Sequence, residues 1–84
     1  MVKVHLYGKL RRFSDNQEPA RDSVTYIAVR EGDTIRDIVR RIGIPFEELG
    51  DNIFLNGRYF DIERQVRDGD RLGLFPNNMA MIIV

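Results

Sequence analysis

One helical segment constrains most strongly what this chain of 84 residues can fold into. Thr34 offers a hydroxyl at an N-cap position and Asp37 follows three residues later, which is the pattern of a capping box. Apolar residues then recur at helical spacing, at Ile35, Ile38, Val39 and Ile42. Gly43 supplies a C-terminal stop, and Pro45 prevents the helix from resuming. The segment predicts an amphipathic helix that must bury its apolar stripe against another element.

Strand patterns precede this helix. Residues 2–6 alternate between apolar and polar side chains, and residues 24–29 are mostly β-branched, aromatic or apolar. We expect these segments to form two paired strands. The stretch 8–23 is rich in charge and turn formers, and Pro19 forbids a regular ladder, so we expect a long exposed loop between them.

Turn signals place further strands after the helix. Asn56-Gly57 stands between two apolar runs, and Asn-Gly is the strongest short hairpin signal because both central residues of a type I′ turn have positive φ. A second turn at residues 68–70 leads into a strand over 71–75, which Pro76 ends. The order predicts an α+β fold of four to five strands and one main helix, as a single domain over residues 1–84.

Composition excludes several classes of function. Thirteen basic residues balance thirteen acidic ones, so no net field attracts nucleic acid or anionic lipid. Cysteine is absent, which rules out disulfides, thiolate metal sites and a thiol nucleophile. No stretch approaches the roughly 20 apolar residues of a membrane span. We expect a cytoplasmic protein that does not bind a membrane, and the charge balance gives no support to binding of nucleic acid.

Catalytic and metal sites have little support in the residues. His5 is the single histidine, and without a second His or Cys we expect it to be a solvated surface residue. Asp68 and Asp70 flank a glycine, and two carboxylates in a turn do not complete a cation site. Phosphate-cradling glycine loops and nucleophile elbows are absent from the sequence. We therefore expect no catalytic residues, no metal, no cofactor and no enzymatic activity.

Four segments in a fixed order carry a family resemblance: the opening VKVHLYGKLRRF, the helix GDTIRDIVRRIGIP, the hairpin LNGRYFD and the closing VRDGDRLGLFP. Together they resemble the small sulfur-carrier proteins, above all the molybdopterin synthase small subunit (MoaD-like) and the thiamine sulfur carrier (ThiS-like). The resemblance implies a ubiquitin-like β-grasp fold, in which a mixed sheet of four to five strands packs on one main helix, and this agrees with the periodicity. It also implies a protein partner, either an adenylating enzyme or the molybdopterin synthase large subunit.

The resemblance implies chemistry at the C-terminus, where the carriers end in a Gly-Gly that is converted to a thiocarboxylate. Glycines suit this role because a tail without side chains can thread a narrow channel. This sequence has no Gly-Gly, and Ala80 and Met81 stand about where the glycines fall. The bulky residues Ile82, Ile83 and Val84 follow. We expect this apolar tail to pack on its own domain, with docking to a partner as the alternative.

Aromatic side chains indicate a binding face. Tyr7, Tyr26 and Phe75 each lie one residue out of phase with the core set of their strand, which places them on the sheet face opposite the helix. Aromatic residues on an open sheet are typical anchors for protein partners. This face, extended by Pro76, resembles the one that the carriers present to their adenylating enzyme.

Three hypotheses of function follow. The first is a protein-interaction module related to the MoaD-like and ThiS-like proteins but without thiocarboxylate chemistry. The second is a divergent sulfur carrier in the biosynthesis of molybdopterin or a related cofactor. The third is RNA binding through the basic segment that contains Lys9, Arg11 and Arg12, which predicts an affinity that falls steeply with added salt.

Overall fold

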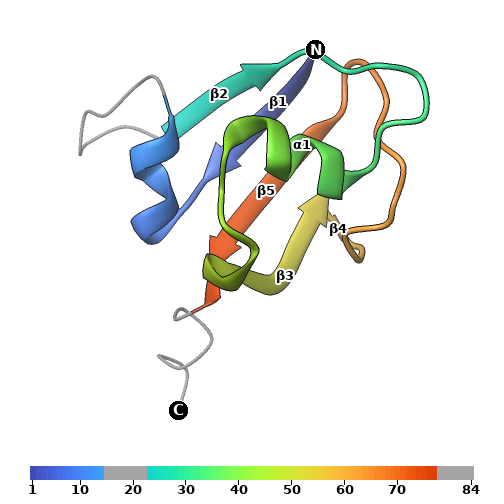
Figure 1. Cartoon of the computed structure of the whole chain (residues 1–84). Helices are drawn as coiled ribbons and strands as arrows, with labels where there is room; N and C mark the ends of the chain where they lie inside the picture. The colour runs from blue at the N-terminus through green and yellow to red at the C-terminus, as the bar shows by residue number, and fades with distance from the viewer. Residues whose placement is uncertain (15–22, 78–84) are drawn as a thin grey trace.

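The computed structural model describes residues 1–14 and 23–77, and Figure 1 shows their arrangement. In chain order the elements are β1 (Val2–Leu6), the 3₁₀ helix η1 (Gly8–Phe13), β2 (Ser23–Ile27), the α-helix α1 (Ile35–Ile42), the 3₁₀ helix η2 (Phe46–Glu48), β3 (Leu49–Leu55), β4 (Arg58–Tyr59) and β5 (Arg71–Pro76). Among these described elements, none is a helix long and apolar enough to cross a membrane.

The described strands form one mixed sheet in the order β2-β1-β5-β3-β4. β1 and β5 run parallel at its centre, and the other pairs are antiparallel. Parallel neighbours need a long crossover connection, and α1 lies on this crossover and packs against one face of the sheet (Figure 1). The predicted ubiquitin-like β-grasp architecture is confirmed.

Alternation along the central strands builds the core. Val4 pairs with Leu72, and Leu6 with Leu74, so these side chains share the face toward the helix. The apolar stripe of α1 meets them, and Ile35, Ile38 and Val39 have no exposed surface. The helix and the central strands therefore bury the alternating apolar residues that the sequence pattern identifies.

The ends of α1 are held as the sequence predicts. Thr34 Oγ1 accepts a hydrogen bond from the Asp37 backbone N–H at 3.4 Å, and Asp37 Oδ2 accepts one from the Thr34 backbone N–H at 2.8 Å. Gly43 ends the helix in the left-handed region, with φ of 96°. The capping box and the glycine stop are both confirmed.

Replacement of the N-cap hydroxyl should weaken the fold measurably. Thr34→Ala leaves a helix N–H without its acceptor, and we expect the free energy of unfolding to fall by about 1 kcal/mol. Urea denaturation followed by circular dichroism measures the change. Thr34→Ser retains the hydroxyl and serves as the control, and an equal loss in both variants would contradict the capping role.

An ion pair ties α1 to the segment that follows β2. Arg41 Nη1 donates to Asp33 Oδ2 at 2.8 Å and to the Ala28 carbonyl at 2.8 Å. The hydrogen bond from Arg41, helped by the Arg30 backbone N–H, holds the pKa of Asp33 below its ordinary value. Asp33 is largely buried. Its ion pair with Arg41 joins α1 to the segment between β2 and α1, which is not part of the sheet.

Stability should therefore depend on the ionisation of Asp33. A carboxyl with a lowered pKa in the folded state stabilises the fold above its unfolded pKa of about 3.9, and this contribution is lost as the pH falls through the lower, folded value. We expect Asp33→Asn to remove part of the loss of stability between about pH 4 and pH 2. Urea midpoints across this range test the expectation, and Asp51→Asn, which removes an exposed carboxylate away from this ion pair, is the control.

Two predictions about the N-terminal half are wrong. The expected exposed loop over 8–23 begins instead with η1, and Leu10 is fully buried in the core. β2 runs over Ser23–Ile27, whereas the pattern predicted 24–29, because its register with β1 pairs Leu6 with Ser23 and Val2 with Ile27. This register turns the hydroxyl residues Ser23 and Thr25 inward. The Ser23 hydroxyl accepts a hydrogen bond from Arg11 Nε at 2.9 Å.

Candidate functional site

The β3–β4 hairpin places two aromatic rings side by side. Asn56 and Gly57 both have positive φ, 53° and 83°, so the predicted type I′ turn is confirmed. The tight turn pairs Phe54 with Tyr59 across the strands, and residues paired in this way lie on the same face. Their ring centroids are 4.2 Å apart.

The central strands add two more rings on the same face. Gly73 of β5 pairs with Phe54 on one side and with His5 of β1 on the other, so these three residues share the face away from α1. Phe75 and Tyr7 follow Gly73 and His5 by two residues and lie on that face too. Both the parallel β1–β5 pair and the antiparallel β3–β5 pair are needed to bring these residues together.

The four rings make a continuous row across the sheet, which we call the aromatic row: Tyr7, Phe75, Phe54 and Tyr59. Tyr7 stacks on Phe75 with the centroids 4.3 Å apart and the planes inclined by 4°. Phe75 meets Phe54 edge to face at 5.7 Å. The row remains accessible, because Tyr7 is 37% and Tyr59 is 65% exposed. Such a surface, with apolar rings and polar hydroxyls, is typical of protein contacts.

A shallow hollow of about 190 Å³ lies beside the row. Gly73 forms part of its lining, together with Tyr7 and Phe54. A Cβ placed on Gly73 would lie 3.6 Å from Phe54 Cβ and 3.7 Å from Tyr7 Cε2, which are ordinary contact distances. The absent side chain at this position therefore leaves room for an apolar group of a partner, rather than being required by crowding.

Positive charge borders the same face. Lys3 pairs with Arg71 across β1 and β5, two residues before His5 and Gly73 respectively. Neither side chain has an ion pair within the described part of the chain. An acidic group on a partner would meet Arg71, which lines the hollow, and Lys3, which is its neighbour across the strands.

The predicted face residues divide into three groups. Tyr7 and Phe75 come together in the aromatic row, as expected. Tyr26 pairs with Lys3 and is 57% exposed, but it has no ring contact with the row among the described residues. The placement of Pro76 on the surface is wrong, because its side chain is fully buried at the end of β5, where it pairs with Leu49.

Two rings of the aromatic row, those of Phe54 and Tyr59, were not predicted from the sequence, although the sequence contains a signal for them. Phe54 and Tyr59 lie at equal distances on either side of the Asn56-Gly57 turn, and a two-residue hairpin loop pairs such positions directly. The tail residues Ala80, Met81, Ile82, Ile83 and Val84 lie outside the described residues, so their predicted packing remains a prediction.

The cations of the basic segment take part in internal contacts. Arg12 Nη2 donates to Glu48 Oε1 at 2.5 Å, and Lys9 Nζ donates to Asn77 Oδ1 at 3.2 Å. Arg11 donates to Ser23. These bonds hold η1 against the rest of the domain, and a phosphate backbone would have to compete with them.

The remaining candidates have structural surroundings. His5 lies on the open face with its ring 6.4 Å from that of Tyr7. Asp70 accepts a hydrogen bond from the Arg67 backbone N–H at 2.8 Å, and Asp68 pairs with the amino group of Met1. Over residues 1–14 and 23–77, no three side chains of His, Cys, Asp or Glu gather in a way that could hold a metal ion.

Comparison with known proteins agrees with the fold. The family model described as Mut7-C ubiquitin matches residues 1–82. A solved structure described as a putative molybdopterin converting factor, subunit 1, from Pyrococcus furiosus is 27% identical, covers 89% of this chain and 94% of its own, and superposes with a TM-score of 0.67. The comparison with curated proteins found no match. The similarity to MoaD-like proteins is confirmed, and the chain belongs to the Mut7-C ubiquitin family.

Proposed function

We propose that this domain is a protein-binding module that works through its aromatic row and carries out no chemistry of its own. The observation that supports this most strongly is the row itself, where three rings from β3, β4 and β5 and the ring of Tyr7, just after β1, meet on the face away from α1. Exposed aromatic side chains that are already packed against one another lose little freedom on binding, so they are effective anchors.

The surroundings of the row indicate the chemistry of the partner. The hollow beside Gly73 fits an apolar side chain. Lys3 and Arg71, which have no ion pair within residues 1–14 and 23–77, favour acidic groups near it. The partner surface should therefore combine an apolar anchor with a nearby Asp or Glu. The family description makes a Mut7-C protein the first partner to test.

Affinity capture with a blocked surface tests this proposal. Gly73→Val puts a β-branched residue, which suits a strand, into the hollow beside Tyr7 and Phe54. We expect the native domain and Tyr26→Ala to capture the same protein from cells of the source organism, and Gly73→Val to lose it. Capture that is equal with all three proteins would contradict binding through the aromatic row.

A sulfur carrier is the second candidate, and the similarity to a putative molybdopterin converting factor subunit favours it. A carrier would also bind its enzymes through one face of the sheet, so capture alone does not separate the two candidates. Incubation of the domain with ATP, a sulfur donor and the captured enzyme separates the two candidates. Mass spectrometry that finds one oxygen of the terminal carboxylate replaced by sulfur would support the carrier and contradict a binding-only role.

A further inference from the structure

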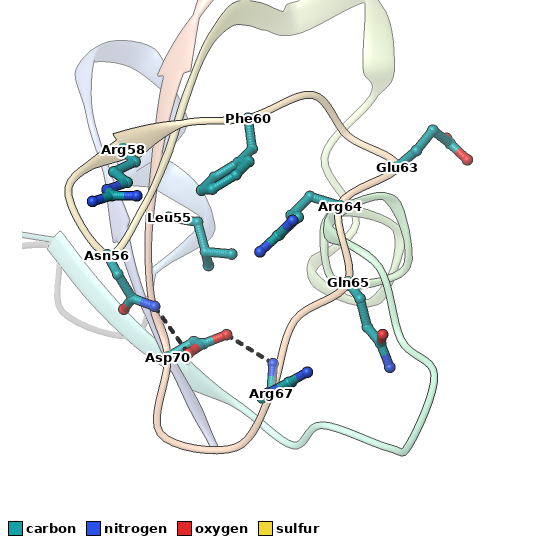
Figure 2. A pocket seen from close by; sticks show the side chains of 9 residues that line it. All are labelled: Leu55, Asn56, Arg58, Phe60, Glu63, Arg64, Gln65, Arg67 and Asp70. Carbon is teal, nitrogen blue, oxygen red and sulfur yellow. Dashed lines mark hydrogen bonds between the residues drawn. The ribbon is translucent and has the colours of Figure 1, made fainter.

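A second hollow, of about 620 Å³, lies between the β3–β4 hairpin and the segment that leads to β5. Figure 2 shows Leu55 and Phe60 within it and three arginines around it, Arg58, Arg64 and Arg67. None of its lining residues belongs to the hollow beside Gly73. It is therefore a separate place for a ligand.

The three arginines are not neutralised within the described part of the chain. None of them has an ion pair or a side-chain hydrogen bond there, and the guanidinium of Arg64 lies over the Phe60 ring, 4.4 Å from its centroid. Unpaired guanidinium groups that border one hollow favour an anion, because each offers several donors in a planar fork.

The carboxylates of the same wall already have other partners. Asp70 Oδ1 accepts from Asn56 Nδ2 at 3.0 Å and Oδ2 accepts from the Arg67 backbone N–H at 2.8 Å, as Figure 2 shows. Glu63 Oε1 accepts from Arg36 Nε at 2.6 Å. Two acidic groups thus hold the walls in place while the guanidinium groups stay available.

The backbone beneath the arginines is held by the start of α1. The Ile35 N–H donates to the Arg64 carbonyl at 2.9 Å, and the Arg36 N–H donates to the Ile62 carbonyl at 2.8 Å. The Val66 N–H donates to the Asp33 carbonyl at 2.9 Å. The segment thus satisfies helix N–H groups that have no acceptor within α1, and its shape is set before any ligand arrives.

We propose that this hollow binds a small phosphorylated ligand of nucleotide size, such as a nucleoside diphosphate. The guanidinium groups of Arg58, Arg64 and Arg67 carry the charge and the planar donors that suit phosphate oxygens, and Phe60, with Arg64 over its ring, offers an aromatic surface for a planar base. The volume lies within the roughly 300–1,000 Å³ of small-molecule sites. The ligand reaches the domain independently of the partner on the aromatic row.

The charge pattern favours a small ligand over a nucleic acid strand. A strand needs a path of cations beyond one hollow, and Lys9, Arg12 and Arg41 are engaged in contacts within the domain. The carboxylates of Glu63 and Asp70 border the hollow, and Asp68 lies close by in the sequence. These acidic groups repel a polyanion that runs across the hollow and beyond it.

Titration with ADP tests the proposal, with pyrophosphate and adenosine as probes of its two parts. We expect saturable shifts of the backbone amide signals of residues 58–70 in NMR spectra with ADP, and none with adenosine. Arg58→Gln and Arg67→Gln should each raise the dissociation constant of ADP about three- to tenfold, because each removes one charge-assisted contact. Arg40→Gln removes the same charge elsewhere and should leave the constant unchanged.

Three results would overturn the proposal. The first is no saturable shift with either ADP or pyrophosphate. The second is an equal effect of Arg40→Gln and Arg67→Gln, which would mean that general charge attraction explains the binding. The third is tighter binding of a single-stranded oligonucleotide, with shifts that extend to residues 9–12, which would indicate a nucleic acid surface. Arg58 and Arg67 are exposed, so the variants should fold, and circular dichroism checks this.

Discussion

Phe75→Ala is expected to weaken the binding of the domain's protein partner about 30-fold or more, which corresponds to the roughly 2 kcal/mol that defines an interface hot spot. Phe75 occupies the centre of the aromatic row, stacked on Tyr7 and in edge contact with Phe54. Its removal takes away one anchor and the ring that orients two others. Isothermal titration calorimetry with the captured partner measures the change in the dissociation constant.

Two further variants show whether an effect on binding comes from the aromatic row or from a change elsewhere in the domain. Tyr26→Ala removes an exposed ring from the same sheet without touching the row, so it should change the dissociation constant less than about threefold, as expected outside a hot spot. Phe75→Leu retains apolar volume but loses the stacking plane, and we expect it to fall between the native protein and Phe75→Ala. If Tyr26→Ala weakened binding as much as Phe75→Ala, the contact surface would lie over β2 and not along the row.

Gly50→Ala is expected to lower the free energy of unfolding by roughly 1–3 kcal/mol, the usual range for an atom added to a space that is already filled. A Cβ on Gly50 would lie 2.9 Å from the Pro76 carbonyl oxygen and 3.1 Å from that of Phe75. Both atoms belong to the backbone of β5, so neither can rotate away. The strands would have to separate where the pairing of β3 and β5 is already irregular. Urea denaturation at neutral pH measures the loss.

Gly73→Ala is the matched control, because it makes the same change in the neighbouring strand. Its Cβ would have ordinary contacts and its φ is not positive, so we expect stability within about 1 kcal/mol of the native value. If both alanine variants lost the same stability, the cause would be the loss of glycine itself and not the close approach of β3 to β5.

The local signals in the sequence predicted the local structures well. Thr34, Asp37 and Gly43 define the two ends of α1, and the Asn56-Gly57 dipeptide forms the expected turn. Each of these features depends on hydrogen bonds or φ values within a few residues, so a single segment contains the information. Half of the aromatic row was identified from the phase of Tyr7 and Phe75 within their own strands.

The wrong predictions concern residues whose surroundings come from distant parts of the chain. Pro76 was placed on the binding face with Phe75, but it is fully buried at the end of β5, where it pairs with Leu49. Leu10 stands among charged residues, which indicated a loop, and only the packing of η1 against the sheet takes it into the core. Burial of one side chain between charged neighbours leaves no periodic pattern in so short a segment.

The sequence by itself determined the kinds of elements, their order and the face on which most side chains lie, because strand alternation and helical spacing are properties of the local backbone. Only the tertiary structure decided which strands are neighbours. The parallel pairing of β1 with β5 brings Tyr7 to Phe75 across 68 positions of the sequence numbering, and the pairing of β5 with β3 adds Phe54. The same holds for the arginine hollow, where hydrogen bonds from the start of α1 shape a segment without regular structure. Both sites depend on long-range packing, and a linear pattern does not record which distant segments meet.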